Sequence, residues 1–420
     1  MELTFNMSLY DGEMEVYAKY KKEDIKKQHF YINRDAIFEF FICDGIERDF
    51  EICSVDLTMF DGYTASKVII PIFSHSFEIK YKLKLSGQTG CCPYVREKIT
   101  QDFTFIRWET FCYPMFFDDW DSFRNLGLKL CLIHIIIPTE SEAISSEQII
   151  DTKRISSSKK MISYISKKQG SDIFNCAIAP YTKLDFSFGS IYFLRSMDDK
   201  KKQIVEDAMN KALFYMNEHF GQRDLSSKIT YASIPDGFGS FACADTGVVF
   251  IQESSFNRVE NLNQIIHEFI HLGWNAKAKD SVQQTRFFDE AFTSYFETRV
   301  MRNLLCDETI NGYVYGQRGV DGIKNGQYKL VPIFEYARMG YGDLSYTIGA
   351  LCLEELCNLL GEELFDSATT AFLNNHRETP ADFEDFCNEY KAFCGAVNEA
   401  RLSQFFDDWI YSCEALKKYI

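Results

Sequence analysis

The hydrophobic period of this chain changes near residue 195, and this change restricts the fold to two structurally different halves. Before it, short runs rich in β-branched and aromatic residues alternate apolar with polar side chains, as in SFEIKYKLKL at 76–85, which predicts strands with one solvated face. After it, apolar residues recur at helical spacing, beginning with the segment at 198–221, which ends in a glycine. We therefore expect an α+β protein, with an all-β domain at residues 1–195 and a mostly helical domain at residues 196–420.

The helical half also contains a small strand region. KITYASIP at 228–235 and TGVVFIQE at 246–253 have strand character, and they flank a glycine-bearing loop, DGFGS, at 236–240. From residue 286 onward almost every segment has a helical pattern. The 38 Phe and 23 Tyr of the sequence predict unusually aromatic cores.

Composition and charge argue against several classes of partner. The net charge of −16 and the absence of a long basic run mean that nucleic acid or an anionic membrane would be repelled. The longest apolar run, LCLIHIII at 130–137, is too short to span a bilayer, and the N-terminus lacks the pattern of a secretory signal. The 14 cysteines include no CxxC pair, so we expect buried thiols rather than disulfides or zinc knuckles. We expect a cytoplasmic protein and leave its oligomeric state open.

The stretch IIHEFIHLGWN at residues 265–275 is the clearest candidate for chemistry. Residues four apart on a helix lie one turn above each other, so the imidazoles of His267 and His271 can bind one metal ion. Glu268 is rotated by about 100° from His267 and can accept a proton from a metal-bound water. The alternative is an ordinary amphipathic helix on which both histidines are merely packed or exposed.

A catalytic zinc site needs three protein ligands and one open position, so a third ligand must lie within reach. Glu290 lies near the start of a second helical stretch, FFDEAFTSYFETRV, and eighteen residues (272–289) separate it from His271. This length suffices for a helix end, a loop and the first turn of an antiparallel helix. We therefore predict one ion held by His267, His271 and Glu290, and two imidazoles with one carboxylate suit zinc best.

HEFIH followed after eighteen residues by DEAF resembles the signature of the gluzincin metallopeptidases of the aminopeptidase N and leukotriene-hydrolase type, family M1. The resemblance implies that His267, His271 and Glu290 bind zinc and that Glu268 is the general base. At lower specificity it extends over nearly the whole chain, and it implies a saddle-like or sandwich-like β domain followed by a thermolysin-like zincin domain. Many members carry a further helical C-terminal domain, which we expect this chain to lack.

Two other residues match the family pattern. Tyr346, in the segment YTIGA, corresponds to a tyrosine whose hydroxyl stabilises the tetrahedral intermediate; the alternative is one more core tyrosine among 23. Glu297, seven residues after Glu290, matches a glutamate usual in that segment, and we expect it to support a zinc ligand through a hydrogen bond. The alternative for Glu297 is a solvated carboxylate on a helix.

The family pattern breaks where aminopeptidases hold the free amine of their substrate. Ala244 occupies the position of the amine-binding glutamate in the G-x-M-E-N segment, and Asp245 occupies that of the asparagine. Asp245 could replace the missing acid, or it could be a turn residue that bonds its own backbone. The strand at 247–252, which begins with Gly247 and Val248, is expected to bind an extended peptide through main-chain hydrogen bonds.

The sequence thus predicts a zinc-dependent, aminopeptidase-like hydrolase of peptide bonds. One alternative uses the same machinery with altered selectivity, as an oligopeptidase that tolerates blocked N-termini. The other is a non-catalytic protein in which zinc stabilises the fold and the cleft captures peptides. The presence of both Glu268 and Tyr346 argues against this last alternative, because a binding protein has no use for a base beside an open metal position.

Overall fold

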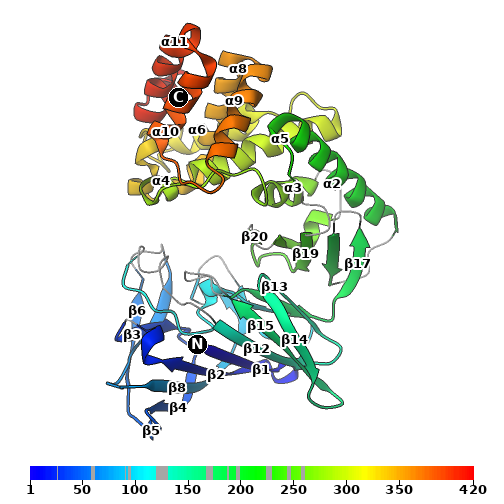
Figure 1. The fold of residues 1–420 in the computed structure, drawn as a ribbon, viewed down its shortest axis with the longest axis vertical. Helices are drawn as coiled ribbons and strands as arrows, with labels where there is room; N and C mark the ends of the chain where they lie inside the picture. Colours follow the sequence, from blue (N-terminus) through cyan, green and yellow to red (C-terminus); the bar gives the residue numbers. More distant parts are fainter. Residues whose placement is uncertain are drawn as a thin grey trace. The chain divides into compact units, whose positions relative to one another are not determined.

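The computed structural model describes residues 1–25, 27–57, 62–89, 91–92, 96–119, 131–166, 174–186, 189–194, 199–223, 229–243, 247–256 and 261–420. The chain forms two compact units (Figure 1). The first unit comprises Met1–Met197 with Ile229–Ser254, and the second comprises Asp198–Lys228 with Ser255–Ile420. We expect a domain boundary between residues 195 and 196. This boundary stays a prediction, because a division into compact units does not by itself define domains.

The first unit is built around an eight-stranded sheet with the strand order β14-β15-β12-β1-β2-β8-β4-β5. Only β1 and β12 are parallel; every other neighbouring pair in this sheet is antiparallel. The strands are β1 (Glu2–Ser8), β2 (Glu13–Lys21), β4 (Ile37–Cys43), β5 (Ile46–Glu47), β8 (Ser76–Lys84), β12 (Cys131–Pro138), β14 (Gln148–Arg154) and β15 (Lys159–Ser166).

The alternation seen in the sequence sets the two faces of this sheet. In β8, Phe77, Ile79, Tyr81 and Leu83 are fully buried, while the lysines between them lie on the opposite face and pair with glutamates of β2 and β4. A strand has a side-chain period of two, so strict alternation places every apolar residue on one face. The apolar face packs into an aromatic core that includes Phe5, Phe30 and Phe41.

Three smaller sheets complete the β region that precedes residue 180. They have the orders β3-β7-β6, β11-β16-β13 and β10-β9. Their strands are β3 (His29–Ile32), β6 (Glu51–Asp56), β7 (Thr64–Ile69), β9 (Ser86–Thr89), β10 (Arg96–Lys98), β11 (Thr104–Ile106), β13 (Glu142–Ser145) and β16 (Cys176–Ala179).

A five-stranded sheet, with the order β17-β18-β19-β21-β20, also belongs to the first unit. Its strands are β17 (Thr182–Phe186), β18 (Gly189–Phe193), β19 (Ile229–Ile234), β20 (Phe241–Cys243) and β21 (Val248–Gln252). Phe105 of β11 packs on Phe241 and Phe250 of this sheet. The buried Arg107 pairs with Glu109 and donates hydrogen bonds to the carbonyls of Phe238 and Gly239. These contacts explain why residues 229–254 group with the N-terminal unit.

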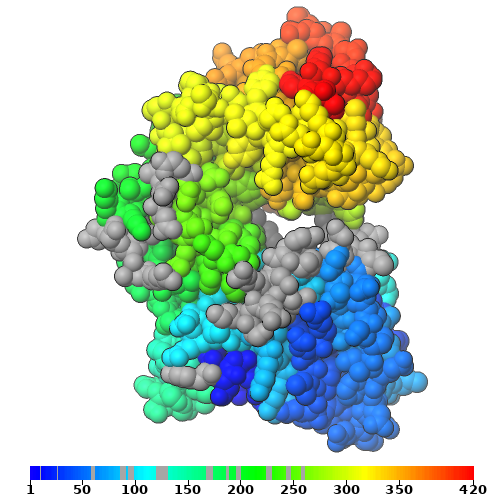
Figure 2. All heavy atoms as spheres, turned by 180° about the vertical axis from the view of Figure 1, so that it is seen from behind, coloured from blue at the N-terminus to red at the C-terminus, as the bar shows by residue number. Residues whose placement is uncertain are grey.

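The second unit is helical in all its described parts except short connections. Its main helices are α2 (Asp199–Phe220), α3 (Leu262–His271), α4 (Asp280–Gln283), α5 (Phe292–Leu305), α6 (Gly312–Lys324), α7 (Tyr336–Met339), α8 (Ile348–Leu360), α9 (Glu362–Asn375), α10 (Phe383–Cys394) and α11 (Ala396–Phe406). Two π-helical segments, η6 (Phe287–Ala291) and η9 (Asp407–Tyr411), and the 3-10 segment η8 (Gly342–Tyr346) adjoin them. In Figure 2 the C-terminal helices form a continuous yellow-to-red surface. The predicted α+β architecture, an all-β N-terminal part followed by a mostly helical part, is confirmed.

Helices α6 and α8 approach each other closely because α6 carries glycines on the face toward α8. A Cβ added to Gly316 would lie 2.8 Å from both Cβ and Cδ2 of Leu351, and one added to Gly312 would lie 2.9 Å from the carbonyl oxygen of Ala350. Such distances leave no room for a side chain. The close approach matters for the site described below, since α8 begins two residues after Tyr346 and α6 carries Tyr315.

This packing predicts that Gly316→Ala destabilises the protein, although alanine favours a helix interior over glycine. The added methyl group must displace Leu351, and such overpacking costs about 1–3 kcal/mol, more than the roughly 1 kcal/mol gained in helix propensity. Urea unfolding followed by circular dichroism measures the difference. Gln317→Ala, on the exposed face of the same helix, is the matched control and should change stability by less than about 0.5 kcal/mol. A Gly316→Ala protein more stable than the parent would contradict the packing.

Candidate metal centre

The structure brings His267, His271 and Glu290 together in the second unit. Their ligand atoms all lie within 4.8 Å of one another. The Nε2 atoms of the two imidazoles are 3.2 Å apart, and Oε2 of Glu290 is 3.1 Å from Nε2 of His267 and 3.3 Å from Nε2 of His271. Three potential ligand atoms therefore converge on one point.

Helix α3 presents the two histidines because its other face is apolar. Leu262, Ile265, Ile266, Phe269 and Ile270 are buried, which fixes the helix against the interior. His267 and His271 lie on the remaining face, one turn apart, with side chains only 13% and 15% exposed. They are thus shielded from bulk water but not sealed within the core.

Glu290 is held by an aromatic cluster rather than by a regular helix start. It lies in the π-helical segment η6, and a π-helix segment shifts the side chains that follow it relative to an α-helix. Phe287 and Phe288 of this segment pack against Phe383 and Phe386 of α10. The carboxylate itself is 3% exposed, so it faces the imidazoles instead of solvent.

The other ring nitrogen of each histidine has its own partner. Nδ1 of His267 is 2.9 Å from Oε2 of Glu297, and Nδ1 of His271 is 2.8 Å from Oδ1 of Asn275. A carboxylate or amide oxygen accepts a hydrogen bond from Nδ1–H, which leaves the lone pair of a neutral imidazole on Nε2. Both Nε2 atoms are therefore oriented as ligands. Glu297 is buried, so the alternative of a solvated carboxylate does not hold for it.

Two of these supporting residues were not predicted from the sequence. Asn275 anchors His271 and also donates hydrogen bonds to Thr293 and to the carbonyl of Asp289; its place four residues after His271 was a usable signal. The hydroxyl of Tyr315, on α6, donates a hydrogen bond to Glu297. No local pattern marks Tyr315, because α6 and α5 are brought together only by the tertiary fold.

The donor set fits zinc. A tetrahedral ion with bonds of about 2.0–2.1 Å keeps its ligand atoms roughly 3.3–3.4 Å apart, close to the three separations given above. Two imidazole nitrogens and one carboxylate oxygen form a recurrent three-ligand set of catalytic zinc sites, which leaves a fourth position for water or substrate. The residues present therefore match this ion in number, type and spacing.

The charges of the three residues shift one another's pKa values. Burial lowers the pKa of His267, but hydrogen bonds to Glu290 and Glu297 outweigh burial and hold that pKa well above its ordinary value. The pKa of His271 is also raised, because attraction to Glu290 outweighs burial. Burial raises the pKa of Glu290, yet Arg286 and His271 bring it well below the usual range. The imidazoles and the carboxylate thus favour each other's charged forms, and Arg286 adds to the effect on Glu290.

Glu268 and Tyr346 both lie beside the triad. Burial raises the pKa of the Glu268 carboxyl, and the two imidazoles offset only part of this effect, which brings the group closer to the range of a general base. The ring of Tyr346 stacks on that of His267, with centroids 5.8 Å apart and an interplanar angle of 12°. The structure therefore places Tyr346 at the triad rather than in a distant core.

A second cluster of potential ligands is already satisfied by an arginine. His219, Glu362 and Asp366 also converge, but the buried guanidinium of Arg299 pairs with both carboxylates. A metal ion would have to displace this charge. We interpret the cluster as an ion-pair network that joins α2, α5 and α9.

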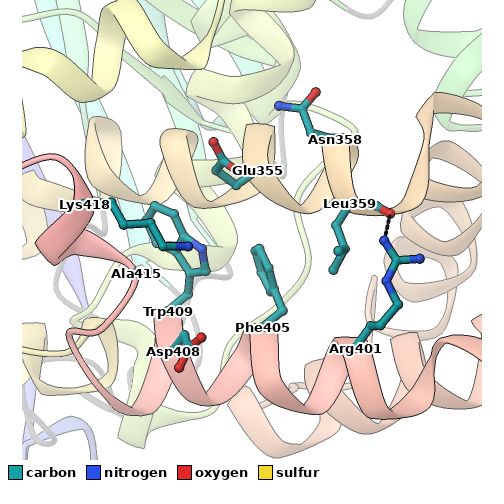
Figure 3. A pocket seen from close by; sticks show the side chains of 9 residues that line it. All are labelled: Glu355, Asn358, Leu359, Arg401, Phe405, Asp408, Trp409, Ala415 and Lys418. Atoms are coloured by element: carbon teal, nitrogen blue, oxygen red, sulfur yellow. Dashed lines mark hydrogen bonds between the residues drawn. The ribbon is translucent and has the colours of Figure 1, made fainter.

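A pocket of 330 Å³ lies between α8 and α11 (Figure 3), and none of its lining residues belongs to the triad. Phe405 and Trp409 project into it, and the guanidinium of Arg401 donates a hydrogen bond to the carbonyl of Leu359 at its edge. These groups include no convergent set of metal ligands or nucleophiles. The pocket therefore does not compete with the triad as a candidate catalytic site.

The residues expected to bind substrate are only partly described. Asp245 lies outside the described residues, as does Ala244. Gly247, with a φ of 70°, precedes β21, which begins at Val248. The expectation that the strand at 247–252 pairs with a peptide is wrong, because Val248 already pairs with Thr230 on one side and Cys243 on the other. The edge strands of this sheet are β17 and β20, and β21 lies inside it.

A helix that carries H-E-x-x-H and meets a downstream carboxylate is the arrangement typical of gluzincin metallopeptidases. Residues 238–409 match the family model described as "Peptidase family M1 domain". The chain therefore contains a family M1 peptidase domain, and the match includes every residue of the triad.

The solved structures extend this likeness to the fold. The structure of yeast LTA4 hydrolase in complex with bestatin superposes on this chain with a TM-score of 0.62 at 13% sequence identity. The match covers 98% of this chain and 67% of the hydrolase chain. At this identity it shows a shared fold. No curated protein matches the sequence.

Within the described part of the chain, no helix combines the length and the apolar character needed to cross a membrane.

The raised pKa values of the two histidines predict that zinc binding releases protons at pH 7. Zinc needs neutral imidazoles, and a raised pKa means that a larger fraction of each imidazole carries a proton at a given pH. The apparent affinity should therefore rise with pH, by up to about tenfold per unit for each proton released. Isothermal titration calorimetry in buffers of different ionisation enthalpy counts the protons. A binding enthalpy independent of the buffer would contradict the prediction, and His75→Gln, which alters an exposed histidine of the first unit, should release as many protons as the parent.

Proposed function

We propose that this protein is a zinc-dependent peptidase of the aminopeptidase-like type, with one zinc ion held by His267, His271 and Glu290. The observation that carries the proposal is the convergence of three ligand atoms at 3.1 to 3.3 Å from one another, with Glu268 and Tyr346 beside them. The family M1 match over residues 238–409 supports peptide-bond hydrolysis as the reaction.

In this proposal each side chain has a separate task. Zinc, when bound, would lower the pKa of a water ligand and polarise the scissile carbonyl. Glu268 accepts the proton of the attacking water and later delivers it to the leaving amine. Burial favours this role, because a carboxylate with a raised pKa is the stronger base. Tyr346, which stays protonated because burial keeps its pKa well above the ordinary value, donates a hydrogen bond to the oxygen that becomes negative.

Two other functions remain as competitors. An oligopeptidase that tolerates blocked N-termini would use the same chemistry, and Ala244 in place of an amine-binding glutamate favours it. A non-catalytic peptide-binding protein would need the metal only for stability. The oriented Nε2 atoms and the half-buried Glu268 beside them argue for catalysis, since a structural zinc site fills all four positions with protein ligands.

Replacement of Glu268 by Gln tests the assignment of the base. The variant keeps the shape and the three ligands but cannot accept a proton, so kcat should fall by about 10²–10⁴ while zinc content and zinc affinity stay those of the parent. Peptide hydrolysis followed by mass spectrometry, together with metal analysis, gives both values. Glu308→Gln, at an exposed position between α5 and α6, serves as the control and should keep full activity. Loss of zinc together with activity would mean that Glu268 is a ligand or a structural residue.

The type of peptidase follows from a pair of peptides that differ only in N-terminal acetylation. The aminopeptidase-like proposal predicts that the free-amine peptide is cleaved at least tenfold faster than its acetylated twin, with both activities abolished by a chelator; tenfold corresponds to about 1.4 kcal/mol of selective binding. Equal cleavage of the two would favour the oligopeptidase. Binding of both peptides to the zinc-loaded protein without any cleavage would favour the non-catalytic protein.

A further inference from the structure

Arg286 is the charged residue at the metal centre that the mechanism above does not use. Its Nη2 donates a hydrogen bond to Oε1 of Glu290 and lies 3.5 Å from Oδ2 of Asp289. Its guanidinium carbon is 5.7 Å from the centre of the Tyr346 ring. A permanent positive charge therefore touches both a proposed zinc ligand and the proposed oxyanion donor.

The surroundings of Arg286 fix its side chain in this place. Its φ of 56° is in the left-handed region, which non-glycine residues seldom adopt. A Cβ at Gly342 would lie 3.3 Å from Cγ and 3.4 Å from Cδ of Arg286, so the absence of a side chain at residue 342 makes room for the arginine stem. The hydroxyl of Ser345 donates a hydrogen bond to the carbonyl of Thr285, which ties the preceding residue to the segment that ends in Tyr346.

Arg286 has donors left for a ligand. A guanidinium offers five N–H groups in a planar fork, and in the described part of the chain only Nη2 has a hydrogen-bond or ion-pair partner. The side chain is 44% exposed, so a ligand can reach the guanidinium from solvent. When zinc binds, the negative charge of Glu290 would be shared between the metal and Arg286. The positive charge of Arg286 would then be less fully neutralised by Glu290.

We propose that Arg286 binds a carboxylate of the substrate, so that preferred peptides carry a negative charge close to the bond that is cut. This inference rests on the proposed peptidase function. The planar fork of an arginine matches a carboxylate better than any other side chain does. The sequence also favours a negatively charged substrate, because Ala244 occupies the position that binds a positive amine in aminopeptidases. The carboxylate has two possible sources, the free C-terminus of a short peptide or an acidic side chain next to the scissile bond.

The experiment compares kcat/KM for matched peptides before and after Arg286→Gln. One pair differs only in the C-terminus, free acid against amide, and a second pair of amidated peptides differs only in Glu against Gln beside the cleaved bond. The parent should prefer the charged member of at least one pair by about tenfold to hundredfold, the size of one charge-assisted hydrogen-bonded pair. A preference within the first pair identifies the C-terminus, and one within the second identifies a side chain.

The ratio within a pair is the deciding quantity, since a loss of activity common to both members cancels. In Arg286→Gln the ratio should fall to about one, and Arg286→Lys should retain part of it because the charge stays while the fork is lost. Arg338→Gln, at an arginine of α7 that is 75% exposed and pairs with Glu335, should keep the parental ratio. Binding of the same peptides to zinc-loaded Glu268→Gln protein, measured by calorimetry, should show the same preference without turnover.

The two proposals fail in different ways. If the parent cleaves no peptide and binds none in the presence of zinc, the peptidase function is wrong and the role of Arg286 falls with it. If the parent cleaves charged and neutral members equally, or if the ratio survives in Arg286→Gln, the peptidase stands and the carboxylate site is refuted. Should Arg286→Gln fail to bind zinc, the parental preference and the partial ratio of Arg286→Lys still decide the question.

Discussion

The structure of the second unit depends on the contact between two imidazole nitrogens and one carboxylate oxygen. The two Nε2 atoms lie 3.2 Å apart beside a buried carboxylate, and the charged form of that carboxylate is favoured both by Arg286 and by the two histidines, whose pKa values it raises. A buried charge without a partner would cost several kcal/mol. The surrounding helices must therefore hold the three groups together.

The packing around the triad supplies that rigidity from several directions. Aromatic rings of η6 and α10 hold the segment of Glu290, and Asn275 joins His271 to the carbonyl of Asp289. The close contact of α6 with α8, which glycines allow, places the Tyr315 hydroxyl on Glu297 and so connects a third helix to His267. Because each ligand is supported by a different element, no single surface loop sets the geometry.

Much of this could be predicted from the sequence, and the reason differs from one feature to another. The strand alternation of β8 and the helical period after residue 198 are local, so they predicted the two-part fold. His267, His271 and Glu290 were predicted because the four-residue spacing places the two histidines on one face of a helix, and the eighteen residues after His271 allow Glu290 to reach them. Tyr315 and Arg286 could not be found in this way, since their roles arise from tertiary contacts without a local pattern. The pairing error at 247–252 has the same origin: a three-residue strand, β20, is too short to show a period, and it covers the edge expected to be open.

In the proposed function, the residues that carry out hydrolysis are separate from those that select the substrate. The triad, Glu268 and Tyr346 all lie in the second unit, and in the proposed mechanism they act on the peptide bond itself, which every substrate shares. Selectivity requires contacts with groups that differ between peptides, and a charge contact discriminates most strongly when the binding group is fixed before the substrate arrives. Arg286 meets this condition. Its left-handed backbone conformation directs the side chain, the missing side chain at Gly342 leaves room for its stem, and its hydrogen bond to Glu290 fixes the guanidinium. A chain with Ala244 at the amine position and a fixed arginine at the metal centre therefore has the electrostatic means to select substrates by their negative charge.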